Sequence, residues 1–226
     1  MNTSLAVVAG AGSGLGQATA IALHAAGYPT VAVDRNKTGL SELPDGIHLE
    51  VADVTDPTVP GPLMDRIVGE IGTPRILVNT IGTFAMGEAL SVTPQQFDEL
   101  IAVNVGTALW LTQSVAPHMQ QAGGGVIVHV TARPGIEPTP GYAGYGVSKA
   151  ALVHLTKTLD LELRPHGIRV NAIAPQVIAT AKNKALFPPE ALVGAVEPEA
   201  LADVIAFLVS DAAASINGAI VPTYGG

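Results

Sequence analysis

A tyrosine and a lysine in the second half of the chain have the types and the spacing for acid–base chemistry. Tyr145 and Lys149 stand at positions i and i+4, and on a helix such a pair shares one face. A phenol with its ordinary pKa of about 10 exchanges protons poorly at neutral pH. A neighbouring ammonium lowers the pKa of the phenol. The pair therefore predicts a general acid/base, with Tyr145 exchanging the proton and Lys149 tuning it.

A glycine-rich segment near the N-terminus has the form of a phosphate-binding turn. Its glycines follow the apolar run 5–9 in the order G-x-x-x-G-x-G. Glycine is needed where φ is positive and where a Cβ would block a pyrophosphate or the packing of helix on strand. The following helix offers free N–H groups to an anion. The segment predicts a dinucleotide site, with an ordinary tight turn as the alternative. The residues expected to contact the cofactor are Gly10, Gly12, Ser13, Gly14, Leu15 and Gly16.

Asp34 ends the next apolar run, 30–34, and is placed to select the cofactor. A carboxylate there accepts hydrogen bonds from both adenosine ribose hydroxyls and repels a 2′-phosphate. Arg35 argues the other way, because a guanidinium just past the strand could reach a 2′-phosphate or stack on adenine. The residues favour NAD over NADP. The alternative for Asp34 is a simple helix or turn cap.

The elements that must position these residues form an alternating pattern. Apolar β-branched runs alternate with helical patterns, which is typical of βα units in a parallel sheet. The expected strands are 5–9, 30–34, 47–50, 76–79, 126–130, 169–173 and 219–221. The expected helices are 15–26, 60–71, 94–122 with a break, 143–164 and 198–210. We therefore predict an α/β fold of Rossmann type, in which residues 1–226 form a single domain with a doubly wound parallel sheet and helices on both faces.

Composition narrows the classes of partner. The chain has 226 residues, 48% of them hydrophobic, and a mean hydropathy of +0.39. Runs such as 76–78 and 126–130 are only strand-length, too short to cross a bilayer. They are typical of strands buried on both faces. We expect no membrane partner.

Charge and residue usage exclude further classes. The net charge of -8, with 11 Lys plus Arg, argues against nucleic-acid binding. The absence of cysteine excludes a disulfide framework and a thiolate nucleophile. The six histidines show no ligand spacing, so no metal is expected. The first ten residues lack a basic n-region, which favours a cytoplasmic protein.

Several motifs, in order along essentially the whole chain, resemble the short-chain dehydrogenase/reductase (SDR) family of the classical type. The glycine turn is similar to T-G-x-x-x-G-x-G, with Ala9 in the threonine position. The Y-x-x-x-K motif corresponds to residues 145–149. The other matching positions are Asp53-Val54 at the adenine ring, Asn79-Thr-Ile-Gly82 for N-N-A-G, Asn104 for a helix asparagine, and residues 171–180 for N-x-x-x-P-G-x-x-x-T.

The resemblance implies an oxidoreductase. Hydride would pass between a substrate carbon and nicotinamide, while Tyr145 moves the proton on the oxygen. Lys149 would also bind the nicotinamide ribose, and Asn104 would hold a water that links Lys149 to solvent. The resemblance further implies a homodimer or homotetramer. It adds as cofactor contacts Asp53, Val54, Asn79, Gly82, Pro175, Ile178 and Thr180.

The chain departs from the family pattern at its expected serine. Ala132 occupies that position, and alanine cannot donate a hydrogen bond to a substrate oxygen. Losing one such donor costs about 3–4 kcal/mol of transition-state stabilisation. Thr131 is a possible stand-in, although neighbouring residues at a strand end point to opposite faces. Thr139 or the substrate itself could also supply a hydroxyl.

The remaining departures concern the substrate. Gln176 replaces a glycine after Pro175 and could project its amide towards nicotinamide or substrate. Arg133 could bind an acidic substrate or simply be a solvated loop arginine. The expected substrate is a small or medium secondary alcohol or ketone, beneath a short substrate loop at 180–197. The alternatives are an NAD(H)-binding sensor or scaffold without turnover, and a non-redox enzyme of the same fold.

Overall fold

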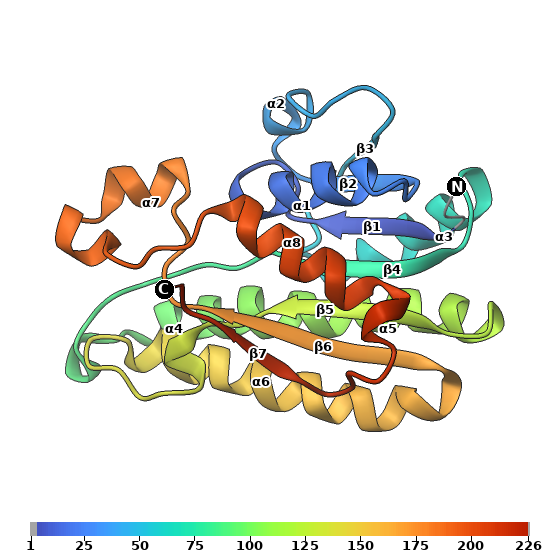
Figure 1. The fold of residues 1–226 in the computed structure, drawn as a ribbon. Helices are drawn as coiled ribbons and strands as arrows, with labels where there is room; N and C mark the ends of the chain where they lie inside the picture. The colour runs from blue at the N-terminus through green and yellow to red at the C-terminus, as the bar shows by residue number, and fades with distance from the viewer. Residues whose placement is uncertain (1–3, 226) are drawn as a thin grey trace.

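The computed structural model describes residues 4–225, built around a seven-stranded parallel sheet (Figure 1). The strand order is β3-β2-β1-β4-β5-β6-β7. The strands are β1 Leu5–Ala9, β2 Thr30–Asp34, β3 His48–Val51, β4 Pro74–Asn79, β5 Gly125–Val130, β6 Ile168–Pro175 and β7 Ile220–Thr223. The predicted doubly wound α/β fold is confirmed.

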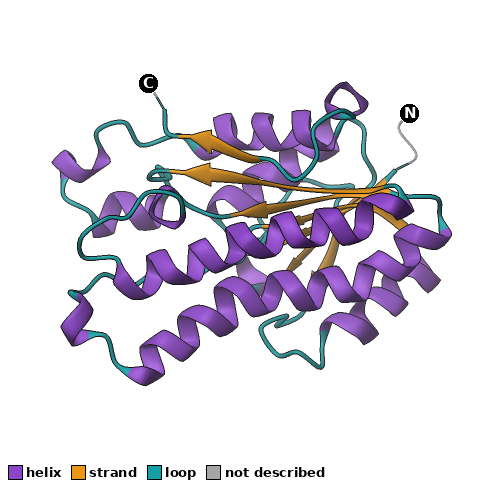
Figure 2. Ribbon diagram, turned by 90° about the horizontal axis from the view of Figure 1, so that it is seen from below, coloured by secondary structure: helices purple, strands orange, loops and turns teal. Residues whose placement is uncertain are grey.

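Helices cover both faces of the sheet. On one face, α1 (Gly14–Ala25) packs against α8 (Pro198–Val209). The other face carries α3 (Pro60–Glu70), α5 (Thr107–Gln121) and α6 (Ala143–Leu163). In Figure 2 long helices lie in front of the strands, and the arrowheads that are clearly visible point to the same side. All neighbouring strands pair in parallel. The carboxyl ends of the strands therefore share one edge, where open α/β sheets bind ligands.

The inner strands are buried on both faces because their side chains alternate between the two helical layers, whereas the edge strands β3 and β7 are partly exposed. In β1, Ala6 and Val8 join the core cluster beneath α1 and α8. Leu5, Val7 and Ala9 join the cluster beneath α3 and α5. All five side chains are buried, so this strand has no polar face. The unbroken apolar runs of the sequence follow from this double burial.

The long third helix contains its predicted irregularity. It consists of α4 (Pro94–Ile101), a π-helical segment at Ala102–Gly106, and α5. The helical path is therefore continuous, although its hydrogen bonding changes at the π segment. Such segments are frequent at functional sites, and this one carries the buried Asn104.

The same helical stretch bears on membrane insertion. Among the described residues, Pro94–Gln121 alone is long and apolar enough, by length and composition, to cross a bilayer. Its hydropathy is 1.2, and 44% of the apolar window is buried. On α5, the side chains of Leu111, Val115 and Met119 are buried in the core cluster that also contains residues of α3.

Short helices were not predicted. The helix α2 (Lys37–Leu40) is capped by the Asn36 side chain, and α7 (Ala181–Leu186) is capped by Thr180. A helix of one or two turns has no apolar period long enough to detect. The predicted substrate loop thus contains α7 and the 3-10 turn η5 (Pro189–Leu192).

Candidate active site

The glycine turn between β1 and α1 is closed around positions that exclude a side chain. Gly10 has φ +87° and Gly14 has φ +52°. A Cβ on Gly16 would lie 1.9 Å from the carbonyl oxygen of Gly10. A Cβ on Gly12 would lie 2.7 Å from the Asp34 carboxyl carbon. The turn therefore requires glycine sterically as well as conformationally.

The first backbone N–H groups of α1 are not hydrogen-bonded within the helix. Ser13 is the N-cap, and its side chain makes no capping bond. The Gln17 N–H bonds the Ser13 carbonyl. The preceding amides of Gly14, Leu15 and Gly16 therefore lack a partner one turn earlier within the helix. The predicted anion site has the required backbone donors, while the Leu15 side chain is buried in the core.

The Asp34 carboxylate faces this turn. Its Oδ2 accepts from the Gly12 N–H at 2.9 Å, and Oδ1 accepts from the Asn36 N–H at 2.8 Å. Both bonds hold the carboxylate beside the glycine turn, where a cofactor contact was expected. The bond from the Asn36 N–H also makes Asp34 a turn cap, which was the alternative. Each oxygen has a second lone pair to offer.

Arg35 takes a different partner from those considered from the sequence. Its Nη1 lies 3.2 Å from Oδ2 of Asp53 in an exposed ion pair. The Thr55 hydroxyl, against an opposing desolvation effect and with help from Arg35, holds the pKa of Asp53 below its usual range. The next residue, Val54, is buried in the core. A hollow of about 440 Å³ also reaches Asp53 between β3 and α3; it is lined by Val51, Ala52, Asp53, Thr58, Val59, Pro62, Leu63 and Arg66.

The segment after β4 is held by side chains on both sides. Asn79 is buried; its Oδ1 accepts from the Ile81 N–H, and its amide donates to the Thr107 hydroxyl. This side chain therefore supports the loop from inside the protein. The Thr80 hydroxyl donates to the Ala9 carbonyl at 2.8 Å. Sequence reasoning missed this role of Thr80, which links β4 to the residue in the family's threonine position.

The predicted pair is brought together on α6. Lys149 is buried, and its Nζ donates to the Val130 carbonyl at 2.9 Å. The same Nζ lies 5.9 Å from the centroid of the Tyr145 ring. A Cβ on Gly82 would meet that Nζ at 3.2 Å, so the ammonium lies beside the loop after β4. The lysine joins the carboxyl ends of β4 and β5.

The charges at the pair differ from the expectation. Burial lowers the pKa of Lys149 to about 8. Burial, with the nearby Tyr142, raises the pKa of Tyr145 above its ordinary value. In the protein alone the pKa of Tyr145 therefore shifts in the direction opposite to that expected from the Tyr145/Lys149 pair, because burial of the phenol is the largest effect. Both residues tend towards their neutral forms.

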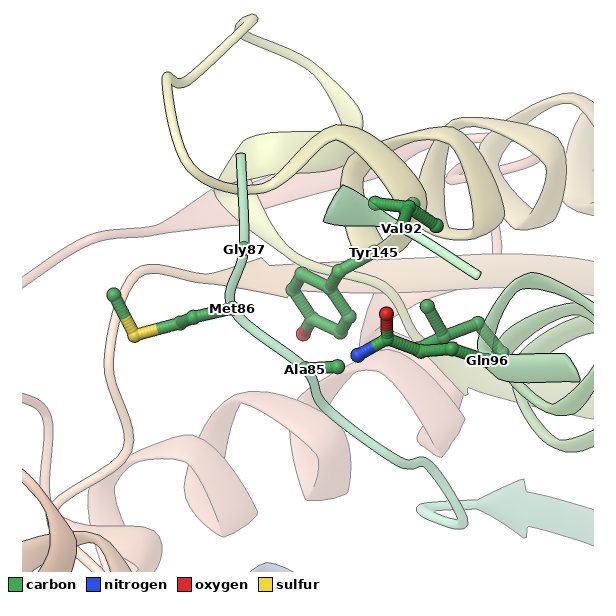
Figure 3. A pocket seen from close by; sticks show the side chains of 8 residues that line it. Ala85, Met86, Gly87, Val92, Gln96 and Tyr145 are labelled. Atoms are coloured by element: carbon green, nitrogen blue, oxygen red, sulfur yellow. The ribbon is translucent and has the colours of Figure 1, made fainter. Parts of the chain in front are cut away.

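An aromatic cluster surrounds Tyr145. The Phe84 ring meets it edge-on at 5.0 Å between centroids, and the Tyr142 ring lies at 6.2 Å. Phe187, which follows α7, packs on Phe84 at 5.7 Å. Figure 3 shows the phenol oxygen directed towards the segment that carries Ala85 and Met86. A crevice at Tyr145 is lined by Ala85, Met86, Gly87, Val92, Gln96, Leu100, Gly144 and Tyr145 itself. Sequence reasoning missed this apolar wall, since its members are far apart along the chain.

Asn104 holds protein groups rather than leaving its side chain for a relay. Oδ1 accepts from the Thr83 N–H at 2.9 Å, while Nδ2 donates to the Thr83 carbonyl and to the Ser148 hydroxyl. The side chain is thus engaged with the protein, and the water-holding role of Asn104 stays a prediction. It clamps the loop that carries Phe84 against α6.

The hydroxyl of Thr131 is not placed as a stand-in for serine. It donates to the Lys149 carbonyl at 3.1 Å, and Thr131 is only 2% exposed. Strand alternation sends this side chain towards α6. Thr139 Oγ1 donates to the Glu137 carbonyl on the exposed loop. The expectation that Thr131 replaces the missing donor at Ala132 is therefore wrong.

The segment after β6 approaches the glycine turn. Pro175 is buried at the strand end, and Ile178 forms an isolated bridge with Val196. The Thr180 hydroxyl accepts from the Asn183 N–H at 3.1 Å. Its methyl group lies 2.9 Å from a Cβ built on Gly14. Thr180 therefore borders the glycine turn, and its contact with the cofactor stays a prediction.

One buried polar side chain was not singled out from the sequence. His129 in β5 is fully buried, and neither ring nitrogen has a hydrogen-bond partner. Burial lowers its pKa to about 4, so the ring is neutral at physiological pH. Within residues 4–225, no group of three or more His, Asp or Glu side chains is arranged to hold a metal ion.

Comparison with known proteins agrees with this geometry. The family model for short chain dehydrogenase matches residues 4–191. A 4-formylbenzenesulfonate dehydrogenase of Comamonas testosteroni is 32% identical, covering 100% of this chain and 98% of its own length. L-xylulose reductase of Bos taurus is 33% identical over 98% of this chain and 95% of its own.

A solved dehydrogenase structure is also similar to this chain. A 7α-hydroxysteroid dehydrogenase complexed with NADH and 7-oxo glycochenodeoxycholic acid superposes with a TM-score of 0.93 and 30% identity. The match covers 99% of this chain and 93% of that one. Sequence motifs, site geometry and relatives lead to one conclusion: the chain belongs to the short-chain dehydrogenase/reductase family of oxidoreductases.

Proposed function

We propose that this protein is an NAD(H)-dependent dehydrogenase/reductase that interconverts a secondary alcohol and a ketone. The observation that carries the proposal is the position of Lys149. Its ammonium lies beside Gly82, in the loop after β4, and within 6 Å of the centroid of the Tyr145 ring. This position supports the proposal, because Tyr145 and Lys149 then lie at the same sheet edge as the glycine turn.

The glycine turn fits a dinucleotide. Its glycines leave no room for a Cβ. The first backbone N–H groups of α1 have no acceptor within the helix. We assign the pyrophosphate to this turn and the adenosine ribose to Asp34. The adenine side belongs to Arg35, Asp53 and the Val54 backbone. The nicotinamide side is assigned to Asn79, Gly82, Tyr145, Lys149, Pro175, Ile178 and Thr180.

The choice of NAD rests on Asp34. Its carboxylate is fixed beside the glycine turn by Gly12 and Asn36, where a 2′-phosphate would meet a like charge. Arg35 is ion-paired with Asp53, so its charge is already partly balanced. Titration with NADH and NADPH tests this choice, and tighter binding of NADPH would contradict it.

The chemistry divides between cofactor and chain. Bound NAD would accept a hydride from the alcohol carbon, so the alcohol loses two electrons and becomes a ketone. Tyr145 takes the hydroxyl proton in this direction and returns it in the other. Because burial raises the pKa of Tyr145, the phenolate needs a cation beside it, which Lys149 supplies. The aromatic cluster around Tyr145 keeps water from the reacting oxygen.

The test is a nicotinamide absorbance assay with a panel of ketones and secondary alcohols. We expect Tyr145→Phe to lower kcat by about 10²–10⁴-fold, the range typical of general acid–base catalysis, with NADH affinity unchanged. Tyr142→Phe is the matched control and keeps most of the activity. Turnover that survives Tyr145→Phe would contradict the assignment.

A second function is favoured by Ala132. The position lacks a hydroxyl, and Thr131 next to it is bound to α6. An NAD(H)-binding sensor or scaffold needs no donor there. NADH binding without any Tyr145-dependent turnover would select this alternative. A non-redox reaction would show as conversion of substrate without a change in nicotinamide absorbance.

We also propose a setting for the protein. Residues 1–226 act as one catalytic domain, with 180–197 as a short substrate loop. The partner is a small molecule, and the working form is a homodimer or homotetramer in the cytoplasm. Sedimentation of the native protein measures the oligomer; a monomer would contradict that part of the proposal.

A further inference from the structure

Polar side chains from neighbouring strand ends meet next to Ala132. Arg133 follows β5, Gln176 follows β6, and Tyr224 follows β7. Nη1 of Arg133 donates to Oε1 of Gln176 at 2.9 Å. The guanidinium carbon lies 4.8 Å from the centroid of the Tyr224 ring. Together with Glu137, these residues form what we call the Arg133 cluster, which the proposed hydride transfer does not use.

The guanidinium of Arg133 is held in place without being saturated. Its Nε donates to Oε2 of Glu137 at 2.8 Å, and one Nη1 hydrogen goes to Gln176. A guanidinium has five N–H donors, so three remain without a recorded partner in residues 4–225. The side chain is 40% exposed. Tyr224 covers the flat face, whereas the donors lie in the guanidinium plane, along its edge.

The contacts within the cluster show which chemical groups the edge of the Arg133 guanidinium binds. The Glu137 side chain, itself 47% exposed, places a carboxylate oxygen on the guanidinium. The Gln176 amide directs its oxygen to Arg133, which leaves its NH₂ group as a further donor. Arginine edges bind carboxylates and similar planar oxyanions through paired charge-assisted hydrogen bonds. The free donors here therefore match a second oxyanion.

We propose that Arg133 and Gln176 bind an anionic group of the substrate, a carboxylate or a sulfonate. This inference rests on the proposed function, because it defines the substrate class of the same site. The aromatic cluster at Phe84, Tyr142 and Phe187 receives the apolar body of the molecule. The substrate is thus an alcohol or ketone with an apolar, flat body and an acidic group. Glu137 is an internal competitor for the guanidinium.

The test uses a matched pair of probes, 4-acetylbenzoate and the neutral 4-acetylbenzamide, each reduced with NADH. We expect kcat/KM to be about 10–100-fold higher for the benzoate, as for hydrogen bonds to charged groups. Arg133→Met should abolish this preference and leave the benzamide rate within about twofold. Lys157→Met, an exposed lysine elsewhere on α6, is the control for net charge and should keep the preference.

Glu137→Gln provides an opposite and charge-selective change. Removing the competing carboxylate should raise kcat/KM for the benzoate about three- to tenfold, through KM, without a matching gain for the benzamide. A purely structural cluster would not respond in this way. Equal effects on both probes, in either variant, would overturn the inference.

The inference and the proposed function can fail separately. If no compound of the ketone and alcohol panel, the two probes included, is turned over in a Tyr145-dependent way, the proposed function fails. Calorimetric titration of 4-acetylbenzoate into the NADH complex then decides the inference. Binding that Arg133→Met abolishes and Lys157→Met keeps would support it, and absence of binding would overturn it.

Discussion

The two halves of the site are built in different ways. In the cofactor half, Gly12 and Gly16 are restricted by atoms nearby, and Asp34 is bonded directly to the turn. In the substrate half, the strand ends carry Ala132 and a threonine that faces away. The cofactor half leaves almost no room for a larger side chain. In the substrate half, Ala132 has no hydroxyl and the hydroxyl of Thr131 is already bonded within the protein. Cofactor binding and turnover can therefore be separated by mutation.

The largest expected effect breaks the cofactor half. In Gly16→Ala the new Cβ would lie 1.9 Å from the Gly10 carbonyl oxygen, so the turn must open. We expect NADH affinity to fall by at least about a hundredfold and the free energy of unfolding by about 1–3 kcal/mol. Fluorescence titration and urea unfolding measure the two.

The control for this change is a glycine with open space around it. Gly69 in α3 has no atom within 4 Å of a built Cβ. Gly69→Ala should leave NADH binding intact and stabilise the helix by up to about 1 kcal/mol. Equal loss of NADH binding in both variants would contradict the steric reason given for Gly16.

The next effect sharpens the contrast in the substrate half. Ala132→Ser introduces a hydroxyl at the position that the motif spacing assigns to the family's serine, and kcat should rise by about 10²-fold, the scale of one donor to a developing oxyanion. Ala132→Cys, of similar size but a weak donor, should gain far less. An unchanged rate in Ala132→Ser would show that the substrate oxygen already has a donor.

A smaller effect comes from the buried amine that joins the halves. The pKa of Lys149 is about 8 in the fold against an ordinary 10.5, so between these values the unfolded chain binds more protons. The free energy of unfolding should therefore rise with pH in this window, by up to about 1.4 kcal/mol per unit. Below pH 8 the cost of burying the ammonium is fully present.

Urea unfolding at about pH 8 and 9.5 measures this dependence, with Lys149→Met as the comparison. Lys149→Met should lack the rise. The window ends before about pH 10, because the raised pKa of Tyr145 acts in the opposite direction from there upward. A wild-type stability that is flat between the two pH values would show that the amine is not desolvated.

The smallest effect tests the orientation of Thr131. Thr131→Val removes the hydrogen bond to the Lys149 carbonyl, which should lower the free energy of unfolding by about 1 kcal/mol. The catalytic rate should change little, since the hydroxyl faces α6. Loss of all activity with stability unchanged would place this hydroxyl on the substrate instead.

Most of the sheet was predictable from local pattern. All seven predicted strands are present with small shifts at their ends. The inner strands were recognisable because a strand buried on both faces reads as an unbroken apolar run. The helices α2 and α7 were missed, since each is held by a cap, from Asn36 and Thr180, rather than by an apolar stripe. Short elements depend on one side chain whose hydrogen bond the sequence does not show.

The sequence by itself determined the chemistry that is local. The glycine turn, Asp34 after β2 and the Tyr145/Lys149 spacing follow from residue type, φ preference and helical period, all properties of a few neighbouring residues. The absence of a hydroxyl at Ala132 was likewise evident from the residue type alone.

Only the tertiary structure decided which groups are left for a ligand. The Asn104 and Thr131 side chains bond Thr83 and Lys149, while Arg133, Gln176 and Tyr224 converge from three strand ends. The physical reason is that hydrogen-bond partners and desolvation depend on contacts between distant segments. The same burial that places Lys149 beside Tyr145 also sets the protonation of both, and no spacing rule contains that information.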